Sequence, residues 1–489
     1  MATTEREARV VERVPKQLCV GGHWRDARSG ATFKVEDPAT GSVLCEVADA
    51  GRADGLDALE AAAAAQPFWA GYPPRDRGEI LRRAYELLVD RQDDLALLMT
   101  LEMGKPVGES KAEIAYAAEF FRWFSEEAVR IGGGYSVAPN GQSRLVVMRQ
   151  PVGPSLLITP WNFPMAMGTR KIGPAVAAGC TVILKPAQQT PLSALALADV
   201  LQEAGLPDGV LSVLPTTDAG GLTGPLLGDG RLRKLSFTGS TPVGRALIKQ
   251  SADQVLRTSM ELGGNAPFIV FDDADLDAAV TGAMQAKMRN IGEACTAANR
   301  LYVQAGVAEE FTARLAERMA ALRVGRGTEA GVDVGPLIDD KARGKVQELV
   351  DDAVTRGARV LLGGEAGDGP GYFYQPTVLA DVPKDSEVSR TEIFGPVAPV
   401  ISFRTEEEVL TEANNTEYGL VSYVFTENLG RALRMAENLE SGMVGLNQGV
   451  VSNPAAPFGG VKQSGLGREG GSVGIDEYLE VKYVGIGGF

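Results

Sequence analysis

Three short segments carry side chains that could do chemistry together. In residues 260–267 a carboxylate, Glu261, stands at a predicted strand end before two glycines. In residues 289–295 a thiol, Cys295, follows small neighbours, and in residues 159–164 an amide, Asn162, lies between a predicted strand and a helix. A thiol can act as a nucleophile, a carboxylate as a general base and an amide as a donor to an oxyanion. Taken singly, each also fits a structural role as a buried thiol, an ion-pair partner or a helix N-cap.

The elements that must position these side chains alternate between strand and helix. Apolar runs predict strands, and 3.6-residue spacing predicts helices. The predicted strands are 152–160, 181–184, 235–239, 268–271, 300–303 and 360–362. The predicted helices are 56–69, 75–103, 164–178, 192–204, 243–249 and two more, one from Asp275 and one ending near Leu322. This βαβαβ order restarts after Gly264, so we expect two doubly wound α/β domains.

Composition argues against several kinds of function. Lys and Arg number 48 against 63 Asp and Glu, a formal charge of −15 with a pI near 4.8. A chain with this negative charge is not expected to bind nucleic acid or an anionic membrane surface, because like charges repel. With one histidine and four widely spaced cysteines, we expect no metal site. The charged first 16 residues and the absence of a long apolar run favour a cytoplasmic protein.

Together the three segments resemble one known family. Glu261-Leu262-Gly263-Gly264, then Gly292-x-x-Cys295 and Asn299-Arg300, stand in the order found in the aldehyde dehydrogenase superfamily. Residues 392–396 and 457–465 also match, and the resemblance spans about residues 21–483. Within the superfamily the chain is most similar to succinate-semialdehyde dehydrogenases, through residues 101–106, 120–124 and 465–470. The resemblance implies the aldehyde dehydrogenase fold: two doubly wound α/β domains plus a small β oligomerisation element.

The resemblance assigns the catalytic roles. Cys295 is expected to add to the aldehyde carbon, Asn162 to bind the oxyanion, and Glu261 to activate the water that hydrolyses the thioester. All three residues are present, which favours a hydrolytic enzyme over a CoA-acylating relative or a non-catalytic binding protein. One departure is Glu293, where the family usually has Gln; we expect its side chain to face solvent rather than the thiol.

The resemblance also implies a nicotinamide dinucleotide cofactor. The turn 239–244 is Gly-Ser-Thr-Pro-Val-Gly, which lacks the middle glycine of the usual fingerprint. Gln188 is neutral where NAD-preferring members often carry Glu, and Lys185 can pair with a 2′-phosphate, so NADP is expected in preference to NAD. The implied cofactor-binding residues are Trp161, Lys185, Pro186, Gln188, Gly239, Ser240, Leu262, Glu392 and Phe394.

Two arginines and a serine imply the substrate. Arg170, Arg289 and Ser452 match the residues that hold the distal carboxylate in succinate-semialdehyde dehydrogenases. A guanidinium fits a carboxylate bidentately, although a structural ion pair is the commoner role of an arginine. We expect oxidation of succinate semialdehyde to succinate. Glutarate semialdehyde, or a broader range of aldehydes, is the alternative, because one methylene is discriminated only weakly.

The expected domain boundaries follow the family pattern. Residues 1–134 and 153–262 form the dinucleotide-binding domain, and residues 263–450 form the catalytic domain. Residues 135–152 and 470–489 fit neither domain and are expected to be oligomerisation segments. The expected assembly is a homodimer or a homotetramer.

Overall fold

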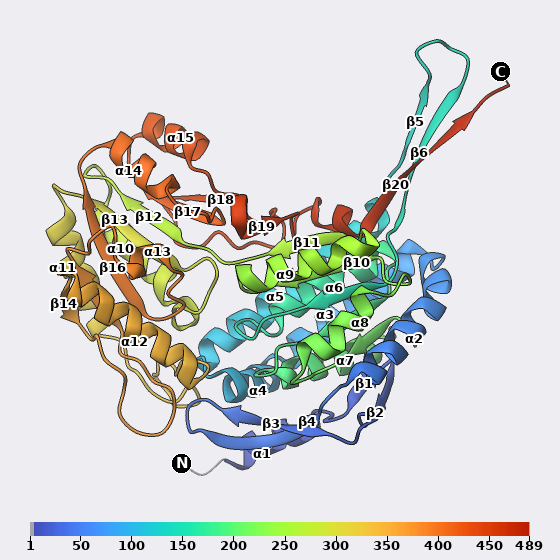
Figure 1. Ribbon diagram of the computed structural model, residues 1–489, viewed down its shortest axis with the longest axis horizontal. Helices are drawn as coiled ribbons and strands as arrows, with labels where there is room; N and C mark the ends of the chain where they lie inside the picture. The colour runs from blue at the N-terminus through green and yellow to red at the C-terminus, as the bar shows by residue number, and fades with distance from the viewer. Residues whose placement is uncertain (1–3, 489) are drawn as a thin grey trace.

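The computed structural model describes residues 4–488, and it contains two α/β units and a projecting β arm (Figure 1). An eight-stranded sheet with strand order β19-β11-β10-β7-β8-β9-β1-β2 lies in the first unit. A seven-stranded sheet with order β14-β15-β16-β13-β12-β17-β18 lies in the second. In the first unit β8 and β9 lie on one side of β7, and β10 and β11 lie on the other. In the second unit β13 lies on one side of β12, and β17 and β18 lie on the other. The expectation of two doubly wound α/β units is therefore confirmed.

The first unit is built around a parallel centre, β11-β10-β7-β8-β9. Its strands are β1 (Leu18–Val20), β2 (His23–Arg25), β7 (Ser155–Ile158), β8 (Val182–Lys185), β9 (Leu211–Val213), β10 (Lys234–Thr238), β11 (Arg257–Glu261) and β19 (Gly465–Leu466). Alternate residues enter two cores, with Leu157 in one and Leu156 and Ile158 in the other. Both faces of the sheet are therefore buried, as expected of a parallel sheet.

Helices cover both faces of this first sheet. They are α2 (Arg52–Ala70), α3 (Pro74–Asp90), α4 (Gln92–Met103), α5 (Val107–Glu127), α6 (Ala166–Ala178), α7 (Pro191–Glu203), α8 (Ala219–Leu227) and α9 (Thr241–Ser251). The single helix expected over 75–103 is wrong, because Arg91 separates α3 from α4 with φ −97° and ψ 11°. Near the N-terminus lie α1 (Glu5–Arg13) and the hairpin of β3 (Thr32–Asp37) and β4 (Ser42–Ala48).

The second unit is continuous in sequence. Its strands are β12 (Ala266–Val270), β13 (Ala298–Gln304), β14 (Arg359–Leu362), β15 (Thr377–Ala380), β16 (Val397–Phe403), β17 (Val421–Phe425) and β18 (Met443–Leu446). Its helices are α10 (Leu276–Met288), α11 (Ala308–Ala320), α12 (Asp340–Thr355), α13 (Glu387–Arg390), α14 (Glu406–Asn414) and α15 (Leu429–Asn438). All its strands are parallel except β14.

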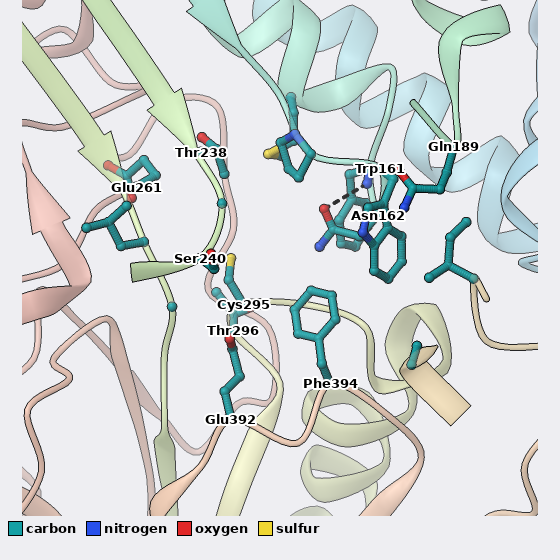
Figure 2. A pocket seen from close by; sticks show the side chains of 18 of the residues that line it. Trp161, Asn162, Gln189, Thr238, Ser240, Glu261, Cys295, Thr296, Glu392 and Phe394 are labelled. Atoms are coloured by element: carbon teal, nitrogen blue, oxygen red, sulfur yellow. Dashed lines mark hydrogen bonds between the residues drawn. The ribbon is translucent and has the colours of Figure 1, made fainter. Parts of the chain in front are cut away.

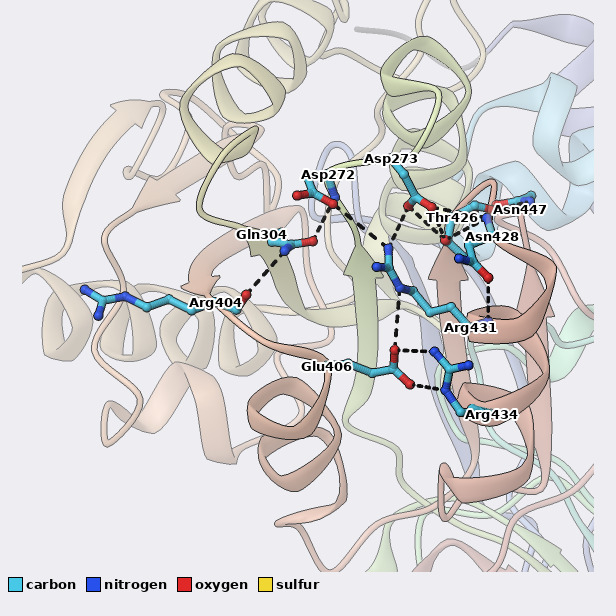
Figure 3. Close-up of polar contacts among 10 residues, drawn as sticks. All are labelled: Asp272, Asp273, Gln304, Arg404, Glu406, Thr426, Asn428, Arg431, Arg434 and Asn447. Carbon is cyan, nitrogen blue, oxygen red and sulfur yellow. Dashed lines mark hydrogen bonds and ion pairs between the residues drawn. The ribbon is translucent and has the colours of Figure 1, made fainter.

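A cluster of charged residues fastens α15 to the strand ends of the second unit (Figure 3). Arg431 pairs with Asp273 at 2.9 Å and with Glu406 at 3.6 Å, and its guanidinium lies 4.4 Å from the Phe271 ring centre. Arg434 binds both carboxylate oxygens of Glu406 at 2.8 Å. Because Asp273 follows β12 and Glu406 begins α14, these contacts join three elements.

The arm is a three-stranded antiparallel sheet that extends away from both units (Figure 1). β20 (Leu479–Ile486) pairs with β6 (Arg144–Pro151) along its whole length, and β6 pairs with β5 (Gly134–Val137). Tyr135, Val481 and Tyr483 on it are each more than 60% exposed. The two segments that sequence reasoning left outside both units thus pair with each other. Among the helices of residues 4–488, none is both long and apolar enough to cross a membrane.

Candidate active site

One cavity of about 830 Å³ lies where the two units meet. Loops that leave the carboxyl ends of β7, β10 and β11 contribute Trp161, Asn162, Gly239, Ser240 and Leu262. Loops that lead into β13 and β16 of the second unit contribute Cys295, Glu392 and Phe394. Because β7 and β10 flank the point where the strand order reverses, this edge is where doubly wound sheets bind ligands.

The three proposed catalytic side chains all line this cavity. In Figure 2 the Cys295 side chain lies between those of Glu261 and Asn162. Cys295 stands just before β13, Glu261 is the last residue of β11, and Asn162 follows β7. Residues far apart in sequence are thus brought together in one cavity, as the sequence predicts.

A tight turn presents the thiol. Asn290, Ile291 and Gly292 all have positive φ, at 54°, 62° and 78°. A β-carbon at Gly292 would meet the Gly395 carbonyl oxygen at 2.2 Å, and one at Gly264 would meet the Cys295 carbonyl oxygen at 2.5 Å. Only glycine fits either position, which explains the glycines in both motifs.

Removal from water raises the pKa of the Cys295 thiol to about 12, and Arg170 opposes this shift. The neighbouring carboxylates Glu392 and Glu261 add to the increase. At neutral pH the sulfur therefore carries its proton in this state of the protein, and a base or a nearby positive charge is needed to activate it.

Glu261 is buried, and its Oε2 has no hydrogen-bond partner among the described residues. Burial raises its pKa well above the ordinary value, and the nearby carboxylate of Glu469 adds to the shift. Glu469 is itself paired with Arg170 and Lys171, which hold its pKa below the ordinary value. A carboxyl group with a raised pKa beside a cavity is suited to take a proton from water.

The expectation that Glu293 faces solvent is wrong. Its side chain is fully buried, and Oε1 accepts a hydrogen bond from the Ile338 backbone N–H at 3.1 Å. Burial raises the pKa of this carboxyl well above its usual value. The side chain points instead towards the loop before α12. There the backbone N–H of Ile338 provides the hydrogen bond that water would provide at the surface.

The two arginines assigned to the substrate differ in their surroundings. Both line the cavity. Arg170 is buried, pairs with Glu469 and lies 4.2 Å from the Phe458 ring centre. Arg289 is half-buried, lies 5.0 Å from the Phe163 ring centre, and has no ion pair with any carboxylate of residues 4–488. Ser452 also lines the cavity.

The proposed cofactor residues divide into two groups. Trp161, Gly239, Ser240, Leu262, Glu392 and Phe394 line the cavity, whereas Lys185, Pro186 and Gln188 are not among its lining residues. Gln189 lines it instead. Glu392 accepts a hydrogen bond from the Gly264 N–H at 3.1 Å, and burial raises its pKa to about 7. Burial lowers the pKa of Lys185 to about 8.

Sequence reasoning gave no role to several residues that build this site. Lys105, Asn290 and Glu469 stand within segments that carry the family resemblance, yet their contacts cross from one unit or helix to another. Tyr116, which also lines the cavity, comes from α5 without any motif around it. Their residue types were visible in the sequence, but nothing in local spacing indicated their partners.

Comparisons with known proteins place the chain in one family. The model of the aldehyde dehydrogenase family matches residues 24–484. A succinate-semialdehyde dehydrogenase from Paenarthrobacter nicotinovorans is 60% identical over 444 residues, which are 91% of this chain and 99% of that protein. A glutarate-semialdehyde dehydrogenase from Pseudomonas aeruginosa is 53% identical over 473 residues, or 97% and 98% of the two chains.

A solved structure extends the similarity to the whole fold. The crystal structure of an NADP-dependent enzyme from Escherichia coli matches with a TM-score of 0.96 at 50% identity and covers 97% of this chain and 98% of that one. The family model, the similar sequences and the shared fold show that the chain belongs to the aldehyde dehydrogenase family.

Proposed function

We propose that this protein oxidises succinate semialdehyde to succinate with NADP, through covalent intermediates on Cys295. The observation that carries the substrate is Arg289, a cation in the cavity with no carboxylate partner within residues 4–488. A half-buried guanidinium in the cavity that makes no ion pair with the described residues favours an anionic ligand. The distal carboxylate of a four-carbon oxo acid would bind there and direct its aldehyde towards Cys295.

The protein's own groups support each covalent step. The Cys295 thiol first loses its proton to water in the cavity, and the thiolate then adds to the aldehyde carbon. The resulting thiohemiacetal oxyanion receives hydrogen bonds from the Asn162 amide and the Cys295 backbone N–H. Loss of hydride from that carbon leaves a thioester on Cys295. Glu261 takes a proton from water, the hydroxide attacks the thioester carbonyl, and succinate leaves as the thiol is restored.

The residues around the cavity fit a nicotinamide dinucleotide. Ser240 precedes α9, whose first N–H groups are suited to phosphate, and Gly244 packs so closely that a β-carbon would lie 2.4 Å from Leu262. The buried hydroxyl of Thr238 on the cavity wall has no hydrogen-bond partner among residues 4–488. When bound, the cofactor supplies the hydride acceptor; Trp161 and Phe394, whose rings meet edge to face, would flank it.

The preference for NADP over NAD has a direct test. Lys185 is buried, burial lowers its pKa to about 8, and it makes no ion pair with a carboxylate of residues 4–488. A 2′-phosphate would compensate its charge, and Gln188 adds no negative charge to repel it. The ratio of kcat/KM for the two cofactors decides the preference; a tenfold or larger advantage for NAD would refute it.

Glutarate semialdehyde is a second candidate substrate. A relative that is 53% identical carries that name, and one methylene changes transition-state binding by only about 1–3 kcal/mol. We propose succinate semialdehyde as the better substrate because the relative at 60% identity is a succinate-semialdehyde dehydrogenase.

A panel of aldehydes tests the proposal. Succinate semialdehyde, glutarate semialdehyde and butanal should be compared by initial rates with each cofactor. Succinate semialdehyde should exceed butanal at least about tenfold in kcat/KM, as expected for one charge-assisted contact. An equal or better rate with butanal would refute the anionic substrate. Sustained turnover without CoA would separate hydrolysis from the CoA-acylating alternative.

The β arm supports a homo-oligomer, as either a dimer or a tetramer. Its exposed apolar side chains form a surface of the kind that another copy covers. In this proposal residues 135–152 and 470–489 make subunit contacts, residues 1–134 and 153–262 bind the dinucleotide, and residues 263–450 supply the nucleophile. Light scattering that returned the monomer mass of 51.6 kDa would refute the assembly.

A further inference from the structure

The proposed oxyanion donor and the proposed nucleophile belong to different α/β units, so some contact must fix one against the other. We propose that Asn290 is the positioning residue that holds the Asn162 amide at Cys295. This inference rests on the proposed function, because it presumes the roles of Asn162 and Cys295.

Asn290 joins the two units through its side-chain amide. Its Nδ2 donates to the Asn162 backbone carbonyl at 3.0 Å and to the Glu293 backbone carbonyl at 2.9 Å. Asn162 in turn donates from its own Nδ2 to the same Glu293 carbonyl at 2.9 Å. Since an amide nitrogen carries two hydrogens, Asn290 uses both on this link, whereas Asn162 keeps one for an oxyanion.

The link has little freedom. Asn290 is 1% exposed, and its backbone N–H donates to Glu109 of α5 at 2.8 Å. Its φ of 54° is a left-handed conformation that asparagine tolerates better than most residues. The amide also has one allowed orientation, because a flipped amide would turn its oxygen towards two carbonyl oxygens.

A second donor supports the same carbonyl from another direction. Lys105 Nζ donates to the Asn162 carbonyl at 2.7 Å and pairs with Glu113 at 2.5 Å. Glu113 accepts hydrogen bonds from the backbone N–H groups of Met165 and Ala166, at the start of α6. Lys105 therefore fixes Asn162 within the first unit. Of the two donors to the Asn162 carbonyl, Asn290 is the one that also binds the loop carrying Cys295, through the Glu293 carbonyl.

The role proposed is positioning rather than catalysis. Asn290 contacts backbone carbonyls and is not among the residues that line the cavity. Its removal should therefore change how well the oxyanion is stabilised, and leave the binding of aldehyde and cofactor almost unaltered. Such an effect appears in kcat with little change in KM.

The test is a double-mutant cycle between Asn290→Asp and Asn162→Ala, read by steady-state kinetics with succinate semialdehyde. The aspartate has the same shape, but it presents an oxygen where two carbonyls need a donor. We expect N290D alone to lower kcat about tenfold or more, with KM within about threefold. In the N162A background the same change should lower kcat less than about twofold, because the donor it positions is gone.

Asn299→Asp is the matched control. Asn299 is also buried, but its amide donates to Asn265 and Thr391 rather than to Asn162. Any fold-loss in kcat caused by N299D should therefore multiply with the fold-loss caused by N162A. The positioning role is refuted if the fold-losses in kcat caused by N290D and N162A multiply, as they should for this control, or if N290D leaves kcat unchanged. In either case the loss of kcat caused by N162A alone still supports the proposed function. If N162A keeps full activity, the oxyanion role fails and the inference fails with it.

A glycine variant covers the case in which N290D does not fold. Asn290→Gly keeps the left-handed backbone and removes both donors. Cys295 alkylation by iodoacetamide is measured alongside, because it needs the thiol but no oxyanion donor. Non-additivity with N162A at a near-normal alkylation rate supports the proposal; equal loss of alkylation and turnover would refute it.

Discussion

Replacing Arg289 by Met should separate substrates by charge. Methionine keeps an apolar stem over the Phe163 ring but removes the free guanidinium from the cavity. A hydrogen bond to a charged group contributes about 1.5–3 kcal/mol. At 1.36 kcal/mol per tenfold change, the loss in kcat/KM for succinate semialdehyde is about 10- to 150-fold, mostly through KM. Butanal carries no carboxylate and should lose less than about twofold.

Arg170→Met is the matched comparison, and it should behave differently. Arg170 is already paired with Glu469, and both side chains are buried. Its removal leaves Glu469 with one cation fewer beside Glu261, and breaking a buried pair costs about 3–5 kcal/mol of stability. We expect a lower melting temperature and a lower kcat for all aldehydes, without selection against the charged one.

Initial rates with both aldehydes, together with thermal unfolding, decide between these outcomes. The ratio of kcat/KM for succinate semialdehyde to that for butanal should collapse in R289M and stay within about threefold of the wild-type ratio in R170M. If R289M slows both aldehydes alike, Arg289 has a structural role and its guanidinium does not bind the substrate carboxylate. If R170M alone collapses the ratio, Arg170 holds the carboxylate in spite of Glu469.

Three further outcomes are expected. Folding raises the pKa of Glu293, so above about pH 4.3 this carboxyl releases a proton on unfolding, and its own contribution to stability falls as pH rises. E293Q should therefore gain melting temperature over wild type increasingly from pH 5 to 8, and a pH-independent gain would contradict this. The Cys295 thiol has a pKa near 12, so its reactive thiolate fraction rises about tenfold per pH unit well below that value. Alkylation of Cys295 in the free enzyme should accelerate to the same extent from pH 7 to 9.5, and a plateau below pH 9 would contradict the raised pKa. Arg431→Met should lower the free energy of unfolding by about 1–2 kcal/mol in urea with kcat unchanged, whereas an unchanged midpoint would show that the cluster is dispensable.

Much of the fold followed from sequence patterns because its strands are short, apolar and separated by helices. The strand expected at 235–239 is β10, at Lys234–Thr238, and the helix expected at 164–178 is α6, at Ala166–Ala178. The break at Arg91 was missed, since α3 and α4 are both helical and no proline or glycine marks their junction.

Side-chain environment was harder to predict than position in the cavity. The motif residues Cys295, Glu261 and Asn162 were found because their order along the chain is distinctive. The orientation of Glu293 depended on a backbone N–H of Ile338, 45 residues further on. The pairing of Arg170 with Glu469 likewise joins residues about 300 positions apart. Tertiary packing determines such partners, and the spacing of residues within one segment does not predict them.

The return of the chain to the first sheet has a consequence for refolding. β19 pairs with β11 through Met260–Leu466 and Glu261–Gly465, after the whole second unit has intervened. The second unit is continuous in sequence, so its strands can pair through contacts within one segment of the chain. The outer edge of β11 instead pairs with β19, about 200 residues away, and contacts of such sequence separation form late. Hydrogen exchange during refolding should therefore protect β12 and β13 before the outward N–H groups of β11. Recovery of turnover should lag behind recovery of secondary structure, because the carboxylate of Glu261 sits on the last strand to be closed in.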